Sequence, residues 1–261
     1  MDTWRTDFAA HPSFHHLTPW LDRIGGPTWP ELSTLNKFAV AENLRNAQAL
    51  PVQFVTQSGR CSQHEYEIGI YGTGQVPSRE RNWHDLFNAL TWLAFPATKA
   101  ALNAVHHAVL PQGKNRTPAS DAATLFDESG LVLVGEDASL ANLLTARRWQ
   151  EALVLRRNEW KTVQAYVIGH AILEKLLTPW PGITAKCLFV NQPPDTPLTA
   201  LDEIIAKQWQ AGSATASITA PAALFPMPVL GIPNWWPANE AADFYANAQI
   251  FRPLRSLTAT K

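Results

Sequence analysis

One helix-sized segment, residues 83–95, is apolar on nearly every side except along a single polar stripe. On a helix with about 3.6 residues per turn, the stripe residues share one face. They are His84, Asp85, Asn88 and Thr91. We expect the helix to be buried, because aromatic and leucine side chains cover its other faces. Its polar groups must then be hydrogen-bonded, paired or bound to a ligand, since each buried polar group left unsatisfied costs roughly 1–3 kcal/mol.

A second helix is predicted directly after the first, from Pro96 to about Leu110, because proline is favoured in the first turn of a helix. Its polar residues again fall on one face, at i, i+4 and i+7, and they are Lys99, Asn103 and His106. Asn82 is the expected N-cap of the first helix. Two successive helices therefore each carry a polar seam.

The composition limits the function mainly by exclusion. The 261-residue chain has a net charge of −1, and 16% of its residues are charged. This balance argues against a broad footprint for nucleic acid or for an anionic membrane, so any ligand must be recognised locally. No apolar stretch reaches the ~20 residues needed to cross a bilayer, and the N-terminus lacks a signal-peptide pattern. Two cysteines argue against a disulfide framework, and we expect a cytoplasmic protein.

Hydrophobic periodicity and turn residues predict the remaining elements. Further helices are predicted at 18–24, 31–48, 139–177 and 198–210. Short strands are predicted at 52–55, 66–71, 131–134 and 183–190, and a loop at 75–81. We therefore expect an α+β fold, a mainly helical single domain over residues 1–261 with a small β-sheet. Residues 1–30 are interpreted as an irregular arm, and the Pro- and Trp-rich residues 221–261 as an extended segment packed on the body.

His84 is the first candidate for chemistry. It lies near the start of its predicted helix, where the positive end of the helix dipole disfavours protonation of the imidazole. A neutral histidine can act as a general base or as a metal ligand, and we group Asp85, Asn88 and Asp127 with it as candidate catalytic residues. In the alternative interpretation, His84 hydrogen-bonds a core carbonyl and Asp85 only caps the helix.

An acidic segment, Asp127-Glu128-Ser129-Gly130, directly precedes a predicted buried strand. Carboxylates at a strand edge often reach into a cleft, where they bind a divalent cation or orient a water molecule. Asp127 and Glu128 are therefore candidate metal ligands. The same composition is also typical of an ordinary turn.

His170 and Glu174 form a third group. Their i, i+4 spacing puts an imidazole and a carboxylate on one helix face, as in a helical metal-binding pair or a histidine oriented by a carboxylate. Gly169, directly before them, permits close packing of this helix. A surface ion pair has the same spacing. The candidate ligands for a divalent metal are thus His84, Asp127, Glu128, His170 and Glu174.

Basic residues lie near the two polar-seamed helices. Arg79 stands just before the first helix, and Lys99 and Arg116 lie on nearby segments. Together these side chains could bind a phosphate or a carboxylate at the N-terminus of the helix. We therefore predict them as substrate-binding residues.

Several well-specified motifs are absent from the sequence. It contains no GxxxxGK[ST] phosphate loop, no GxGxxG after a strand, no GxSxG nucleophile elbow, no HExxH and no CxxC pair. Nucleotide hydrolysis by a P-loop, a dinucleotide cofactor and a structural zinc site are therefore not expected.

Four stretches of the sequence carry a family resemblance, and they are 76–79 with 82–90, 124–130, 169–176 and 228–233. Together they resemble a bacterial family of proteins of unknown function, domain-of-unknown-function family 3025. The resemblance spans about residues 52–253. This family brings no established activity, so the resemblance implies no catalytic roles.

The sequence favours a hydrolase, with or without a divalent metal, that acts on a small phosphorylated or otherwise anionic substrate. In this interpretation His84 and His170 point into one shared cavity. The alternative is a non-catalytic binding or assembly protein, in which the polar seam is a satisfied buried network and the Trp/Pro-rich C-terminal segment docks a protein partner. Joint exposure of Trp235 and Trp236 would favour this alternative, because aromatic anchors are typical of interfaces.

Overall fold

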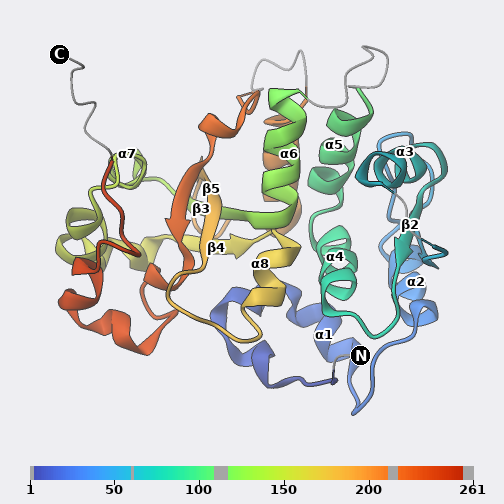
Figure 1. The fold of residues 1–261 in the computed structure, drawn as a ribbon, viewed down its shortest axis with the longest axis horizontal. Coiled ribbons are helices and arrows are strands. Elements are labelled where there is room, and N and C mark those ends of the chain that lie inside the picture. The colour runs from blue at the N-terminus through green and yellow to red at the C-terminus, as the bar shows by residue number, and fades with distance from the viewer. Residues whose placement is uncertain (1–2, 60–61, 109–116, 211–216, 255–261) are drawn as a thin grey trace.

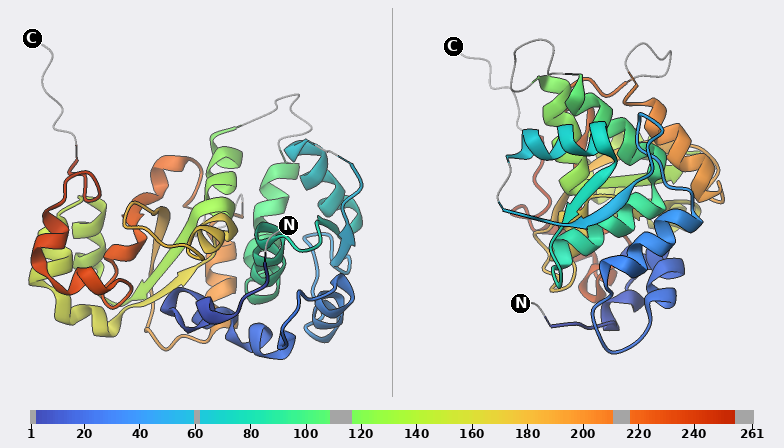
Figure 2. Two further views of the ribbon diagram at one scale, coloured as in Figure 1. Left: turned by 60° about the horizontal axis from the view of Figure 1, so that its bottom comes forward. Right: turned by 90° about the vertical axis from the view of Figure 1, so that its right-hand side faces the viewer.

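The computed structural model describes residues 3–59, 62–108, 117–210 and 217–254 and has an α+β fold (Figure 1). The strands of this part of the chain form two sheets. Two helices, α4 (Trp83–Ala94) and α5 (Pro96–His107), lie between the sheets (Figures 1 and 2). The predicted fold class is confirmed, with a second small sheet that the sequence did not predict.

The smaller sheet pairs β1 (Gln53–Thr56) with β2 (Gln75–Ser78) in parallel, and α3 (Gln63–Thr73) connects the two strands. This β-α-β unit packs beside α5 and supplies one wall of the site described below.

The strand predicted at 66–71 is therefore wrong, and so is the loop predicted at 75–78. Ser62 and Glu65 form a reciprocal capping box that begins α3, and Gly74 ends the helix in the left-handed conformation with φ 75°. These signals at the two ends of the helix outweigh the preference of the aromatic and β-branched residues between them for a strand.

The other helices of the described chain are α1 (Thr18–Ile24), α2 (Leu32–Ala41), α6 (Pro118–Ser129), α7 (Ala138–Thr145), α8 (His170–Lys175) and α9 (Leu198–Lys207). Short 3-10 segments and a π-helical turn at Glu151–Leu155 connect them. Within the described ranges, no helix is long and apolar enough to cross a membrane.

The larger sheet has the strand order β4-β3-β5-β6, in which β3 and β5 are parallel and both outer strands are antiparallel to their neighbours. The strands are β3 (Gly130–Gly135), β4 (Gln164–Val167), β5 (Thr184–Asn191) and β6 (Phe225–Pro228). The end of β4 pairs with the start of β3, through Val167 and Leu131. Helix α6 directly precedes β3, and α8 follows β4. The end of α6 and the start of α8 therefore meet where β3 begins and β4 ends.

The helix predicted at 139–177 is wrong over most of its length. α7 ends at Thr145, and Arg147 follows in the left-handed conformation with φ 54°. β4 and α8 occupy the later part of the range. An apolar spacing of three and four does not distinguish a helix from irregular turns whose side chains reach the same core, as those of Trp149 and Trp160 do.

Two further predictions need smaller corrections. The helix predicted at 31–48 ends at Ala41, and Asn43 follows with φ 49°. The acidic segment that contains Asp127 and Glu128 forms the last turn of α6, not a turn at a strand edge. A helix that begins at Thr117 and Pro118 with a capping box continues through these residues.

α4 is buried along almost its whole length, as the sequence predicts. Phe87 and Leu90 are fully buried, and Trp92 is 1% exposed. The N-terminal arm, which forms 3-10 turns, covers the start of the helix with the Phe8 ring, packed edge-on against Trp83 and Phe87. Asp85, Asn88 and Thr91 of the polar stripe are therefore inside the protein, and His84 is partly exposed.

The described part of the C-terminal segment packs on the rest of the chain and adds β6 to the larger sheet. Tyr245 and Phe251 are buried. Trp235 is 7% exposed, and its neighbour Trp236 is only partly exposed. The two tryptophans do not form the exposed pair that would favour the docking alternative.

Trp92→Ala should lower the free energy of unfolding by roughly 3–5 kcal/mol, because it removes a fully buried ring and leaves a cavity. Trp180→Ala is the matched control, since 48% of that side chain is already exposed. Urea denaturation of both variants measures the difference. A Trp92 variant that is as stable as the parent would show that α4 is not buried.

Candidate functional site

The polar stripe of α4 faces a cavity of about 440 Å³. His84 and Asn88 line it from α4, Tyr66 from α3, Glu128 from α6 and His170 from α8. The volume suits a small ligand. The prediction that His84 and His170 point into one shared cavity is confirmed.

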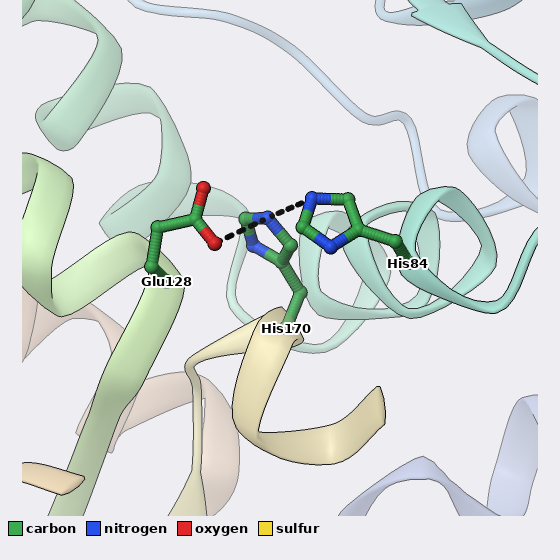
Figure 3. A group of neighbouring side chains, drawn as sticks. All are labelled: His84, Glu128 and His170. Carbon is green, nitrogen blue, oxygen red and sulfur yellow. Dashed lines mark hydrogen bonds and ion pairs between the residues drawn. The ribbon is translucent and has the colours of Figure 1, made fainter. Parts of the chain in front are cut away.

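Three side chains converge in this cavity, from the start of α4, the end of α6 and the start of α8 (Figure 3). His84 Nε2 lies 3.1 Å from His170 Nε2, and His170 Nε2 lies 3.6 Å from Glu128 Oε2. Each of the three residues has one potential metal-ligand atom that lies within 4.8 Å of those of the other two. The two imidazole rings meet at 84°.

A close backbone approach holds His170 beside Glu128. The backbone N–H of Gly169 donates to the carbonyl of Gly130 at 2.9 Å. A Cβ at Gly169 would lie 2.4 Å from the backbone nitrogen of Gly130 and 2.5 Å from the Cα of Ser129. Only glycine fits there, so the close packing expected at Gly169 is confirmed.

Two of the three separations are close to those in a metal site, and the third is within 4.8 Å. With metal–ligand bonds of about 2.0–2.1 Å, neighbouring ligand atoms in a tetrahedral site lie roughly 3.3–3.4 Å apart. The separations of 3.1 Å between the two Nε2 atoms and 3.6 Å from Nε2 to the carboxylate oxygen bracket this value. His84, Glu128 and His170 could therefore hold a divalent ion with small adjustments.

Each imidazole has a carboxylate at its other nitrogen. His84 Nδ1 lies 3.1 Å from Glu174 Oε2, and His170 Nδ1 lies 3.9 Å from Asp127 Oδ2. Metal-binding histidines commonly have a hydrogen-bonded partner that orients the ring and fixes its tautomer. Glu174 is such a partner for His84, whereas Asp127 lies beyond hydrogen-bond distance of His170 Nδ1. Glu174 and Asp127, which the sequence predicts as ligands, thus lie behind the imidazoles and not with the three converging groups.

The Glu174 carboxylate also decides which nitrogen of His84 carries hydrogen. A carboxylate within hydrogen-bond distance of Nδ1 favours hydrogen on Nδ1, which leaves the lone pair of His84 on Nε2. His170 Nδ1 has no hydrogen-bond partner among the described residues, so His170 Nε2 either donates its hydrogen to His84 Nε2 or, with hydrogen on Nδ1, offers a lone pair of its own. In the second tautomer, two imidazole nitrogens and the Glu128 carboxylate lie close together, as the ligands of a cation do.

The ionisation of His170 and Asp127 fits this arrangement, whereas the raised pKa of Glu128 opposes it. Burial lowers the pKa of His170 to about 3, so its ring is neutral and keeps a free lone pair. Burial of Asp127 opposes ionisation, yet attraction to the Lys99 ammonium outweighs it and holds the pKa of this carboxyl below its ordinary value. Burial raises the pKa of Glu128.

Asp85 binds Arg79 instead of closing a capping box. Nε and Nη2 of the guanidinium donate to the two carboxylate oxygens at 2.8 Å each, and the backbone N–H of Arg79 donates at 2.6 Å. The Asn82 side chain accepts the backbone N–H of Asp85, which confirms the predicted N-cap. Asp85 thereby fastens the connection between β2 and α4.

The rest of the stripe is also satisfied. Asn88 Oδ1 accepts a hydrogen bond at 2.8 Å from the buried Lys99 ammonium, which also binds Asp127. The Thr91 hydroxyl donates to the Ile168 carbonyl at 3.4 Å. The two seams of α4 and α5 thus meet in one network around the cavity.

The predicted substrate-binding residues have carboxylate partners or lie outside the described chain. Arg79 and Lys99 belong to ion pairs, and Arg116 is not among the described residues. The described lining of the cavity contains one arginine and four acidic side chains, which are Glu67, Asp85, Asp127 and Glu128. Such a cavity attracts a cation more readily than a free anion.

Sequence reasoning missed two cavity residues, Tyr66 and Glu67, because it placed them on a strand. The capping-box pattern that begins at Ser62 was the available signal for a helix. Asn103 donates to both the carbonyl and the carboxylate of Glu67, at 2.8 and 2.7 Å. Burial raises the pKa of Glu67.

The chain belongs to the family described as Protein of unknown function (DUF3025), whose sequence profile matches residues 52–255. The matched range contains the three converging residues and the carboxylates behind them. No curated protein and no solved structure matches the chain. The function must therefore be inferred from the site itself.

We expect one Zn²⁺ to bind per chain. His84→Asn, Glu128→Gln and His170→Ala should each weaken Zn²⁺ binding at least about tenfold, because each removes one of three ligands. His84→Asn should keep much of the fold, since asparagine can still hydrogen-bond and the helix start does not require an imidazole. Isothermal titration calorimetry gives the affinities, and thermal melting checks the fold.

His64→Ala, which removes an exposed histidine of α3, is the control and should bind Zn²⁺ like the parent. A His84→Asn protein that is clearly destabilised but binds Zn²⁺ as tightly as the parent would contradict the assignment of His84 as a ligand.

Proposed function

We propose that this protein is a metal-dependent hydrolase that acts on a small phosphorylated or otherwise anionic substrate. The observation that carries the proposal is the convergence of His84, Glu128 and His170, each of which places one potential ligand atom within 4.8 Å of the other two. Two histidines and one glutamate are a ligand set of catalytic zinc sites, which leave a coordination position open for water or substrate.

A bound divalent ion would supply an acidified water and polarise an oxygen of the substrate. The chain's own residues orient the ligands. Glu174 holds the ring of His84, and Asp127 faces the ring of His170 from the opposite nitrogen. Asp127 is itself held by Lys99, so an ion pair with little solvent access lies beside His170.

The charge of the cavity supports a substrate whose binding depends on the metal. Carboxylates outnumber basic groups in the described lining, and the nearest cations are paired. An anion alone would therefore be repelled, whereas the two positive charges of a divalent ion would offset part of the negative charge and attract the anion directly. The cavity volume of about 440 Å³ limits the substrate to a small molecule or to one group of a larger one.

A non-catalytic binding or assembly protein is the second candidate. The hydrogen-bonded stripe of α4 favours it, because Asp85, Asn88 and Thr91 each have a partner within the described chain. The burial of Trp235 weakens the docking part of this alternative.

The proposal is tested with protein loaded separately with Zn²⁺, Mn²⁺ or Fe²⁺ and assayed on p-nitrophenyl phosphate, bis-p-nitrophenyl phosphate and p-nitrophenyl acetate. We expect hydrolysis that EDTA abolishes and added metal restores. His170→Ala should reduce the rate at least about a hundredfold, because one ligand is lost, while His64→Ala should retain it.

Two outcomes would contradict the hydrolase. Iron in the purified protein without hydrolysis would favour a non-haem iron oxygenase, for which two histidines and one carboxylate are also typical. No metal binding, together with a His84→Asn variant that only loses roughly 1–3 kcal/mol of stability, would favour the buried network.

A further inference from the structure

A chain of hydrogen bonds runs along the wall of the cavity and ends at the hydroxyl of Tyr66. Lys99 donates to Asp127 and, at 2.8 Å, to Asn88 Oδ1. Asn88 Nδ2 then lies 2.9 Å from the Tyr66 hydroxyl oxygen. This series of hydrogen bonds connects the Lys99–Asp127 ion pair, behind the candidate metal site, to the phenol of Tyr66 in the same cavity.

The direction of every bond in this chain is fixed by chemistry. An ammonium can only donate, so the side-chain group of Asn88 that faces Lys99 must be the carbonyl oxygen. The amide nitrogen is then directed at Tyr66, and it can only donate. The Tyr66 oxygen is therefore the acceptor, and its own hydrogen must point away from Asn88.

The Tyr66 hydrogen is available to a ligand. In the described part of the chain, the amide of Asn88 is the hydrogen-bond partner recorded for this hydroxyl. Tyr66 lines the same cavity as His84, Glu128 and His170. Asn88 lies one helical turn after His84 on the same face of α4, so the phenol is hydrogen-bonded to the turn of the helix that follows His84.

The phenol keeps its proton in this environment. Burial raises the pKa of Tyr66 well above its ordinary value, and the carboxylates of Glu67, Asp127 and Asp85 add to the shift. The guanidinium of Arg79 and the ammonium of Lys99, the cations nearest to it, have carboxylate partners. Tyr66 is thus a neutral donor beside basic groups that are already engaged.

We infer that Tyr66 is a catalytic hydrogen-bond donor, which binds an oxygen of the substrate that is held between its hydroxyl and the His84, Glu128 and His170 site. This inference rests on the proposed function and narrows its substrate. The reacting group is a phosphoryl or carbonyl group, because hydrolysis of either one builds negative charge on an oxygen, and a preorganised donor stabilises that charge. Lys99 and Asn88 are positioning residues that aim the phenol.

The test uses Co²⁺-loaded protein, whose visible spectrum reports metal binding, and inorganic phosphate as the oxyanion probe. Tyr66→Phe should leave the affinity for Co²⁺ unchanged within about twofold, because Tyr66 is not a ligand. It should weaken phosphate binding roughly ten- to a hundredfold, the effect of losing one hydrogen bond to a charged group. Tyr71→Phe is the matched control, since its hydroxyl lies on the same helix but bonds to Gln48.

Asn88→Asp tests the direction of the hydrogen bonds between Lys99, Asn88 and Tyr66, while the phenol of Tyr66 is kept. An aspartate accepts from both Lys99 and Tyr66, so the Tyr66 hydrogen turns away from the cavity. Asn88→Asp should therefore weaken phosphate binding about as much as Tyr66→Phe does. The double variant should be no worse than either single variant, whereas an added negative charge acting on its own would give additive losses.

The outcomes separate this inference from the proposed function. Phosphate binding that Tyr66→Phe leaves unchanged, in protein that binds Co²⁺ normally, overturns the role of Tyr66 and leaves the metal-dependent hydrolase in place. Additive losses in the double variant overturn the directed chain. Failure of the parent protein to bind Co²⁺ overturns the metal centre, and the inference with it.

Discussion

The ion pair between Lys99 and Asp127 is the interaction on which the rest of the site depends. Both side chains have little solvent access, so neither charge is tolerable without the other, and loss of one partner in such a pair costs roughly 3–5 kcal/mol. The pair also has two directional consequences. It sets an ionised carboxylate beside Nδ1 of His170, and it turns the carbonyl of Asn88 toward α5. The ion pair thus lies beside His170 and, through Asn88, directs the hydroxyl of Tyr66.

The part of this arrangement that the sequence predicts comes from strong local signals. The segment 83–95 has aromatic and leucine residues on three sides, and Asn82 is an effective N-cap, so the helix and its polar face could be read directly. Burial of that face then required partners. His84 and His170 both carry groups suited to one ligand, and the structure brings their Nε2 atoms to 3.1 Å.

The missing part depends on tertiary contacts that no local pattern encodes. The i, i+4 spacing suggested that His170 and Glu174 act together, but Glu174 lies at Nδ1 of His84, 90 positions away. Residues 66–71 have the composition of a strand, and only the capping box before them and Gly74 after them mark a helix. For this reason the sequence did not predict Tyr66 as a cavity residue. A strand at 66–71 would not have placed its side chain beside Asn88.

The stripe of α4 shows why a structural network and a binding site need not be alternatives. Asp85, Asn88 and Thr91 are each matched by a donor or an acceptor within the chain, as buried polar groups must be. His84 is matched at Nδ1, and its Nε2 lies 3.1 Å from His170 Nε2. Burial lowers the pKa of His170 to about 3, so this ring is neutral, and its Nε2 either donates one hydrogen to His84 or keeps a lone pair, according to its tautomer. A divalent cation would take the place of that hydrogen and bind both Nε2 atoms, and the fully bonded remainder of the stripe would then be its rigid support.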